Sequence, residues 1–212
     1  MEKRSVVIYA EPVSNVVGFN MVLADYALKS GIPVIYIAID RSPDEYMSIS
    51  KNYGLSVHNS NKFVFVNGYY AFSGKSCEAM DHISNITNLE EFDMKVFSSF
   101  ERLGSSPSLI IVDSFSTYYL HNKKELITKF YQLFNARVKN IYGSLVYIVY
   151  KGIQTKDFDS VLYSYADILI ELKLSEKRGN VYRISKKIGY EMLQEWKGIK
   201  KFNEDDINTI FF

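Results

Sequence analysis

Short apolar runs alternate along this chain with longer segments of helical periodicity. The runs are rich in β-branched residues and contain almost no charge, as expected for strands that are buried on both faces of a sheet. They occupy residues 5–10, 33–40, 62–68, 108–116 and 144–152. Strands that alternate with helices predict parallel β-α-β units with right-handed crossovers, and therefore a three-layer α/β fold.

Local signals predict the ends of the first two helices. The first helix is expected to begin near Ser14 and to end at Gly31, with an apolar face between them. Asn20 and Asp25 fall on other faces of this helix. Ser42 is the predicted N-cap of the second helix, because a proline and two acidic residues follow it.

Two further helices and a hairpin complete the predicted fold. One helix is expected from about Glu78 to Leu103 and another within residues 123–141. The apolar face of the second is predicted from helical spacing to contain Leu126, Phe130, Phe134 and Val138. Residues 167–189 alternate on either side of a Gly-Asn turn signal, which predicts an antiparallel hairpin at the end of the sheet.

Length and composition favour a single domain. A chain of 212 residues with 47% hydrophobic residues is long enough for one sizeable core. We expect that core to span about residues 5–190 within one domain, residues 1–212. The tail, residues 191–212, ends in the apolar sequence INTIFF, which is expected either to pack back as a last strand or to be buried by another subunit.

The charge and cysteine content exclude several classes of protein. Lys and Arg number 25 against 24 Asp and Glu, so no overall charge favours nucleic acid or an anionic membrane. The single cysteine, Cys77, excludes an internal disulfide and a Cys-rich metal site. No apolar stretch is long enough to span a membrane. We therefore expect a cytoplasmic protein.

Candidate site residues gather where the predicted parallel strands end. In open α/β sheets, ligands bind beyond the carboxyl ends of the strands. Residues 10–17, Asp40 and Asp113 are expected at that edge.

Several stretches, in order, resemble the KaiC-like branch of the RecA-type P-loop ATPases, including its archaeal stand-alone members. AEPVSNVV is similar to the family's GEPGSGKT phosphate loop, and SLIIVDSFS resembles its Walker B strand. GIPVIYIAIDRSPDEY resembles its second strand and following helix start, and YADILIEL with YRISKKIGY resembles its closing hairpin. The resemblance extends to about Gly189 and implies a RecA-like fold with nucleotide bound at residues 10–17.

The phosphate loop departs from the family pattern at most positions. Such a loop needs glycines, so that backbone N–H groups can surround the phosphates, a lysine for their charge, and a hydroxyl for magnesium. Glu11, Pro12 and Ser14 match that pattern. The three glycines are replaced by Ala10, Val13 and Asn15, the lysine by Val16 and the magnesium-binding hydroxyl by Val17. Losing the lysine and the hydroxyl contacts would weaken binding by about 3 to 6 kcal/mol, or about 10² to 10⁴ in affinity.

The resemblance also assigns the acidic residues. Asp113 corresponds to the Walker B aspartate and is followed by Ser114, and Asp40 corresponds to the first of two acidic positions, of which the second is Arg41. Without a bound γ-phosphate these carboxylates have no general-base role, so we expect vestigial positions and no catalytic residue.

Aromatic and basic residues on two loops suggest a second class of function. Tyr118, Tyr119 and Lys151 follow predicted strands in a region where RecA-type proteins touch single-stranded nucleic acid. The alternative is that the tyrosines cap the core, and the balanced charge favours this alternative.

Two other features are weak. Residues 68–76 nearly match a phosphate loop, but five residues separate Gly68 from Gly74 where the motif has four. His58, His82 and His121 lack the spacing of metal ligands, and no metal is expected.

The sequence therefore predicts a catalytically inactive KaiC/RecA-like protein that acts as a regulatory or interaction subunit. Its partner is expected to be a protein, either an intact paralogue or another copy of itself, and no cofactor is expected. One alternative is an accessory protein of recombination or repair that binds single-stranded DNA. The other is weak binding of ATP and Mg²⁺, with Asp40 and Asp113 on the metal and Lys75 or a neighbouring subunit's lysine on the phosphates.

Overall fold

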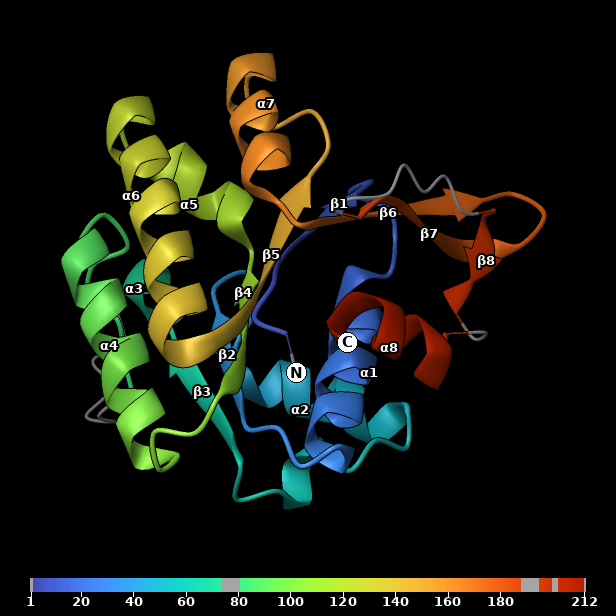
Figure 1. Cartoon of the computed structure of the whole chain (residues 1–212), viewed down its shortest axis with the longest axis horizontal. Helices are drawn as coiled ribbons and strands as arrows, with labels where there is room; N and C mark the ends of the chain where they lie inside the picture. The colour runs from blue at the N-terminus through green and yellow to red at the C-terminus, as the bar shows by residue number, and fades with distance from the viewer. Residues whose placement is uncertain (1, 74–80, 188–194, 200–201, 212) are drawn as a thin grey trace.

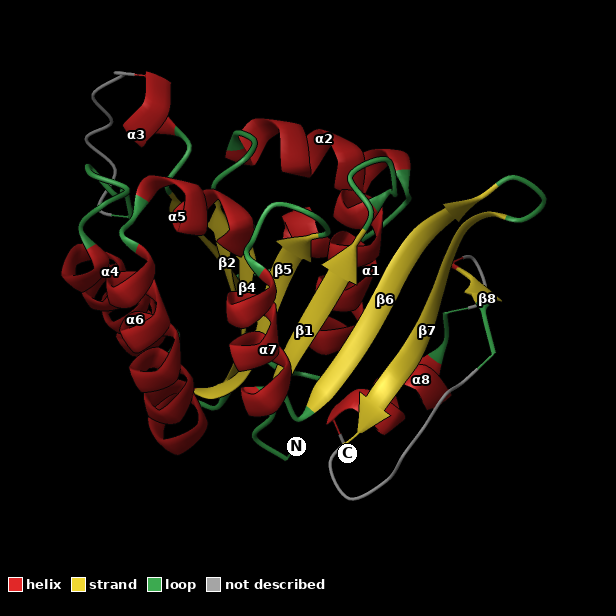
Figure 2. Ribbon diagram, turned by 90° about the horizontal axis from the view of Figure 1, so that it is seen from above, coloured by secondary structure: helices red, strands yellow, loops and turns green. Residues whose placement is uncertain are grey.

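The computed structural model describes residues 2–73, 81–187, 195–199 and 202–211 as one mixed sheet with helices on both faces (Figures 1 and 2). The strands are β1 (Ser5–Ala10), β2 (Val34–Ala38), β3 (Phe63–Asn67), β4 (Ser108–Asp113), β5 (Gly143–Tyr150), β6 (Ile168–Ser175), β7 (Gly179–Lys187) and β8 (Lys197–Gly198). Their order in the sheet is β3-β2-β4-β5-β1-β6-β7-β8. Strands β1 to β6 are parallel, and β7 and β8 are antiparallel to their neighbours. The predicted three-layer fold and closing hairpin are confirmed.

Helices cover both faces of this sheet. They are α1 (Val16–Lys29), α2 (Pro43–Asn52), α3 (Tyr70–Ser73), α4 (Leu89–Arg102), α5 (Phe115–His121), α6 (Lys124–Arg137), α7 (Lys156–Tyr165) and α8 (Glu204–Phe211), with a 3₁₀ turn at Val57–Asn59 and a π turn at Val138–Tyr142. One core lies between the sheet and α1, α2 and α8, and a second lies between the sheet and α4 to α7 (Figure 2). None of these helices is long and apolar enough to cross a membrane.

Capping residues explain where the helices begin. The Ser42 hydroxyl accepts from the Glu45 N–H (3.3 Å) while the Glu45 carboxylate accepts from the Ser42 N–H (3.0 Å), so the predicted N-cap of α2 is a full capping box. Helix α4 begins later than expected because Asn88 caps it, accepting from the Glu91 N–H at 3.0 Å. Residues 81–88 are not helical, and residues 78–80 lie outside the described part of the chain.

Two predicted helix faces differ in the structure. Asn20 and Asp25 of α1 are both buried. Asn20 faces the sheet beside Tyr36 and Asp113. Asp25 accepts a hydrogen bond from the Ser56 N–H (2.7 Å), just after α2. In α6 the buried face contains Ile127, Tyr131 and Phe134, whereas Leu126 is 55% exposed. The predicted face was therefore wrong at Leu126.

The end of the chain is a helix and not a strand. Ile207 and Ile210 of α8 are buried in the core on the α1 face of the sheet, and the ring of Phe202 packs 4.9 Å from that of Phe19. Tyr182 on β7 donates a hydrogen bond to the buried Asp206 carboxylate (2.6 Å). Strand β7 therefore anchors α8 beside α1.

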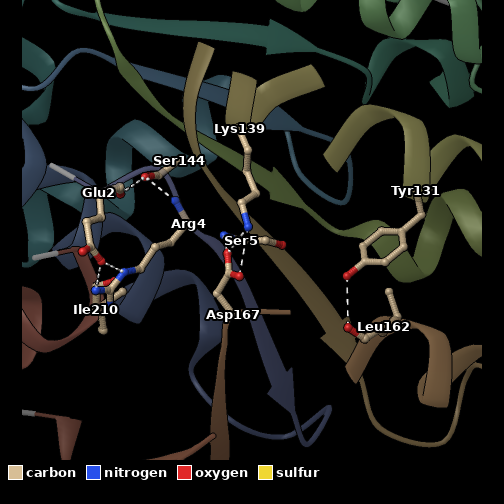
Figure 3. Close-up of polar contacts among 9 residues, drawn as sticks. All are labelled: Glu2, Arg4, Ser5, Tyr131, Lys139, Ser144, Leu162, Asp167 and Ile210. Atoms are coloured by element: carbon tan, nitrogen blue, oxygen red, sulfur yellow. Dashed lines mark hydrogen bonds and ion pairs between the residues drawn. The ribbon is translucent and has the colours of Figure 1, made fainter. Parts of the chain in front are cut away.

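A polar network fixes the edge of the sheet where β1 starts (Figure 3). The Asp167 carboxylate accepts from the Ser5 N–H (2.7 Å) and pairs with Lys139 (2.7 Å). Arg4 donates from its backbone to the Ser144 hydroxyl (3.2 Å) and from its guanidinium to the Ile210 carbonyl (3.4 Å), which ties α8 to the sheet. These contacts are structural and lie at the edge opposite the candidate site.

Candidate functional site

The candidate site lies at the carboxyl ends of β1, β2 and β4. In Figure 2 the arrowheads of β1 and β5 end beneath the loops at this edge. Residues 11–15 join β1 to α1, Asp40 follows β2, and Asp113 is the last residue of β4. Parallel strands bring these three segments together, as the sequence predicted.

Residues 10–17 form a turn whose backbone does not enter the positive-φ region that favours glycine. All eight residues are described, and none has a positive φ. The Val13 side chain is 70% exposed on the turn, whereas Val16, which the sequence resemblance aligns with the family's lysine, is buried in the core. The turn therefore offers neither the flexible backbone nor the cation of a phosphate loop.

The first donors of the turn are bonded within the protein. The Ser14 N–H and hydroxyl both donate to the Glu11 carbonyl, at 2.9 and 2.6 Å. The Val16 N–H donates to the Ser14 carbonyl at 2.9 Å, and the Glu11 N–H donates to the Leu172 carbonyl on β6 at 3.0 Å. These bonds close the turn on itself and onto the neighbouring strand.

Asn15 closes the amino end of α1. It is the N-cap residue, and its side-chain oxygen accepts from the Gly18 N–H at 3.0 Å. Its own N–H donates to the side-chain oxygen of Asn180 on β7 at 2.8 Å, and its amide group donates to the Tyr53 hydroxyl at the end of α2. Protein acceptors thus take the N–H groups of Asn15 and Gly18, which lie where a phosphate loop would hold a ligand.

A cavity of about 960 Å³ lies beside Asn15. Its lining comes from Tyr53, the hairpin turn at residues 178–180 and residues 195–199. Arg178 donates to the Trp196 carbonyl at 3.2 Å, and Lys197 pairs with Asp206 at 2.8 Å. The cations that line this cavity are therefore engaged with the protein itself.

Asp113 is fully buried beneath aromatic side chains. The Tyr36 hydroxyl donates to one carboxylate oxygen at 2.7 Å, and the other oxygen has no hydrogen-bond partner among the described residues. Burial raises the pKa of Asp113 to about 6, and the negative charge of Asp40 adds to the rise. Tyr36, Tyr46 and Asn20 act in the opposite direction, although neither Tyr46 nor Asn20 forms a hydrogen bond of standard geometry with it.

Asp40 has a different environment from Asp113. It is exposed and accepts from the Thr117 hydroxyl at 2.5 Å. Arg41 reaches Glu45 at 3.7 Å. Ser114, joined to Asp113 by a cis peptide bond, caps α5 by accepting from the Thr117 N–H at 3.4 Å. One carboxylate is thus open to solvent while the other is enclosed by protein.

The candidate contacts to nucleic acid do not form a stacking surface. Tyr118 is fully buried with its ring 5.0 Å from that of Phe92, so it cannot stack on a base, and its assignment as a contact was wrong. Tyr119 is half-buried, packs 4.7 Å from the Phe158 ring and bonds the Thr155 hydroxyl at 3.3 Å. Lys151 is exposed. The alternative that the tyrosines cap the core describes Tyr118 correctly.

The remaining candidates do not form a site in the described part of the chain. His82 lies 3.2 Å from the Asn67 carbonyl, and the His121 ring packs against Phe72. The described residues contain no group of three His, Cys, Asp or Glu side chains arranged to hold a metal ion. Lys75 and Cys77 lie outside the described residues.

Solved structures with the same architecture include three archaeal proteins. The flagellar accessory protein FlaH of Methanocaldococcus jannaschii matches with a TM-score of 0.69 and 16% identity, over 91% of this chain and 83% of FlaH. The KaiC-like protein PH0186 of Pyrococcus horikoshii matches with a TM-score of 0.67 and 12% identity, over 92% of this chain and 84% of PH0186. The protein PH0321 of the same organism was solved in complex with an unknown peptide. It matches with a TM-score of 0.64 and 16% identity, over 94% of this chain and 90% of PH0321.

The chain has a KaiC-like fold. At these identities the likeness concerns the fold alone, and neither a protein-family profile nor a curated protein matches the sequence.

Sequence reasoning missed the residues that enclose this site. Asn180 and Tyr53 reach Asn15 from distant elements, and Tyr36, Tyr46 and Asn20 surround Asp113. An available signal was the pair of tyrosines on a predicted buried strand and its following helix, since buried hydroxyls need polar neighbours. Asn180 gave no signal beyond its place in a turn.

Proposed function

We propose that this protein is a non-hydrolysing KaiC-like protein that acts as an interaction or regulatory subunit. The observation that carries the proposal is the closed amino end of α1, where protein acceptors take the N–H groups of residues 14, 15, 16 and 18. A phosphate would have to displace these bonds and would meet no lysine in return. The turn is therefore a structural element that joins β1, α1 and the hairpin.

The acidic residues support the same proposal. A metal-assisted hydrolysis needs carboxylates that are ionised and reach the ligand. Asp113 is enclosed by protein, with the Tyr36 hydroxyl donating to one of its oxygens, and its raised pKa of about 6 leaves it mostly protonated below that pH. Of these two carboxylates, Asp40 is the one that faces solvent.

An interaction role accounts for a shared fold that lacks the glycines and the lysine of a phosphate loop. One protein of the same fold, PH0321, was solved in complex with an unknown peptide. We place the function of this chain in the same broad class, with a protein as partner and no nucleotide cofactor.

Isothermal titration calorimetry with Mg-ATP tests the proposal. We expect no saturable binding of the wild-type protein at millimolar ATP, because the loop lacks contacts that together contribute about 3 to 6 kcal/mol. A dissociation constant in the low micromolar range would contradict the proposal.

A loop-restored variant provides the matched comparison. It combines Ala10→Gly, Val13→Gly, Asn15→Gly, Val16→Lys and Val17→Thr, and its control has Val16→Met with the other four changes. We expect weak ATP binding by the lysine variant and none by the methionine control, because the charge supplies much of the phosphate affinity. Circular dichroism establishes that both variants are folded, since Val16 belongs to the core.

A further inference from the structure

Exposed apolar side chains gather on the outer face of α4 and α6. Figure 1 shows these helices side by side on the outside of the sheet. Five large apolar side chains on α4, on α6 and in the following π turn are 44–63% exposed: Met94, Phe97, Leu126, Leu133 and Ile141. Exposed apolar side chains that gather on one face mark an interaction surface more often than singly scattered ones do.

A groove runs between the two helices. Its volume is about 710 Å³, and its apolar lining includes Leu89 from α4 and Leu126, Phe130 and Leu133 from α6. The Phe130 and Phe134 rings stack at 5.2 Å beneath it. The aromatic floor is packed into the core, so the groove is a fixed feature of the surface.

Opposite charges flank the groove. Glu90 lies on the α4 side and Lys129 on the α6 side, and both are exposed. Neither has an ion-pair or hydrogen-bond partner among the described residues. Asp93 and Arg137 pair with each other across the groove. The groove therefore has an acidic rim on α4 and a basic rim on α6, and Glu90 and Lys129 are the unpaired charges on these rims among the described residues.

We propose that this face is a self-association surface whose occupant is a second copy of the chain, related by a two-fold axis along the groove. Such an axis places α4 of each copy over α6 of the other. Glu90 then faces Lys129 of the partner subunit, and the pair occurs twice. This inference rests on the interaction role proposed above, for which it names the partner and the surface.

The size of the face sets the strength of the contact. Helices of 14 residues are about 21 Å long and pack about 10 Å apart, which gives a face on the order of 400 Å² in projection. Two such faces bury about 800 Å² in total, which is below the usual range of stable interfaces, so the dimer is expected to be weak and transient. A net charge of +1 adds little repulsion between copies.

Sedimentation velocity over a series from low to several hundred micromolar protein tests the surface. Wild type is expected to shift from monomer to dimer, and Leu133→Asp is expected to raise the dissociation constant more than about tenfold, because each dimer buries two such side chains. Leu174→Asp is the matched control on β6, where Leu174 is 48% exposed, and it leaves dimerisation unchanged. A monomer at every concentration, or a Leu133→Asp variant that dimerises like wild type, overturns the proposal.

Charge exchange tests the two-fold arrangement. Lys129→Glu is expected to raise the dissociation constant by about tenfold, since it creates two like-charge contacts. Adding Glu90→Lys is expected to restore wild-type dimerisation. A double variant that dimerises no better than Lys129→Glu alone contradicts this axis. Both positions are exposed, and circular dichroism verifies folding. The readout is independent of ATP binding, so this inference can fail while the proposed function stands.

Discussion

Replacing Asp113 by asparagine should stabilise the protein at neutral pH. Burial holds the pKa of this carboxyl at about 6, against 3.8 as the ordinary value. The folded protein therefore binds a proton at Asp113 more tightly than the unfolded chain does. Stability from this group is greatest below about pH 4, and is lost as pH rises through the interval from 3.8 to about 6.

The magnitude follows from the difference in pKa. About two units correspond to about 3 kcal/mol, which is an upper limit for the cost of the ionised carboxylate in the folded state. Asparagine keeps an oxygen to accept from Tyr36 and presents an amide toward Tyr46 and Asn20, whose polar atoms lack partners among the described residues. An amide does not titrate between pH 4 and pH 7.5, so any free-energy cost of packing it at this position is the same at every pH and leaves the pH dependence unchanged.

Urea unfolding followed by circular dichroism, from pH 4 to pH 7.5 at constant ionic strength, measures the effect. The free energy of unfolding of Asp113→Asn minus that of wild type should rise by about 2 to 3 kcal/mol between pH 4 and pH 7. Asp44→Asn, at an exposed position of α2, is the control and should change by less than about 1 kcal/mol. A difference that stays flat or falls across this interval would refute the reasoning.

Three further substitutions test separate parts of the structure by chemical denaturation. Asp167→Ala should lower the free energy of unfolding by about 3 kcal/mol, because it leaves the Ser5 N–H and the Lys139 ammonium without their carboxylate; a change below about 1 kcal/mol would argue against a structural network. Asn15→Ala should cost about 1 to 2 kcal/mol through loss of the N-cap of α1, whereas an unchanged midpoint would mean that the cap does not form. Ile210→Ala should cost about 2 to 5 kcal/mol if α8 belongs to the folded core, and a neutral result would show that α8 is undocked in solution.

The strands were predictable because each is a compact run of apolar residues with a clear stop. The run at residues 5–10 became β1 with the same boundaries, and the hairpin followed from alternation around its turn. The start of α2 was predictable because Ser42 and Glu45 carry the whole capping box within four residues. These signals are local, so the sequence alone contains them.

The errors arose where distant segments decide burial. Asn20 was placed off the apolar face of α1, yet it is buried facing the sheet beside Tyr36 of β2 and Asp113 of β4. In α6 two apolar stripes overlap, and helical spacing alone did not reveal that Ile127 faces the sheet while Leu126 faces outward. Tyr118 was offered as a contact because a loop was expected there, but it lies in α5 over the core.

The candidate site was predictable in position and only partly in content. Parallel strands place residues 10–17, Asp40 and Asp113 at one edge whatever the side chains are. The substitutions in the phosphate loop were visible in the sequence. The partners that close it were not, because Asn180 and Tyr53 reach Asn15 only through the folded hairpin and α2.

The central claim is that the N–H groups of Ser14, Asn15, Val16 and Gly18 at the amino end of α1 are bonded to protein acceptors. Nuclear magnetic resonance of ¹⁵N-labelled protein tests it directly, with Mg-ATP added while the signals of Ser14, Asn15, Val16 and Gly18 are followed. Our account predicts that these four amide signals keep their positions at millimolar nucleotide. Saturable shifts confined to these amides would contradict it, because they would place the triphosphate where the chain's own oxygen atoms are bound.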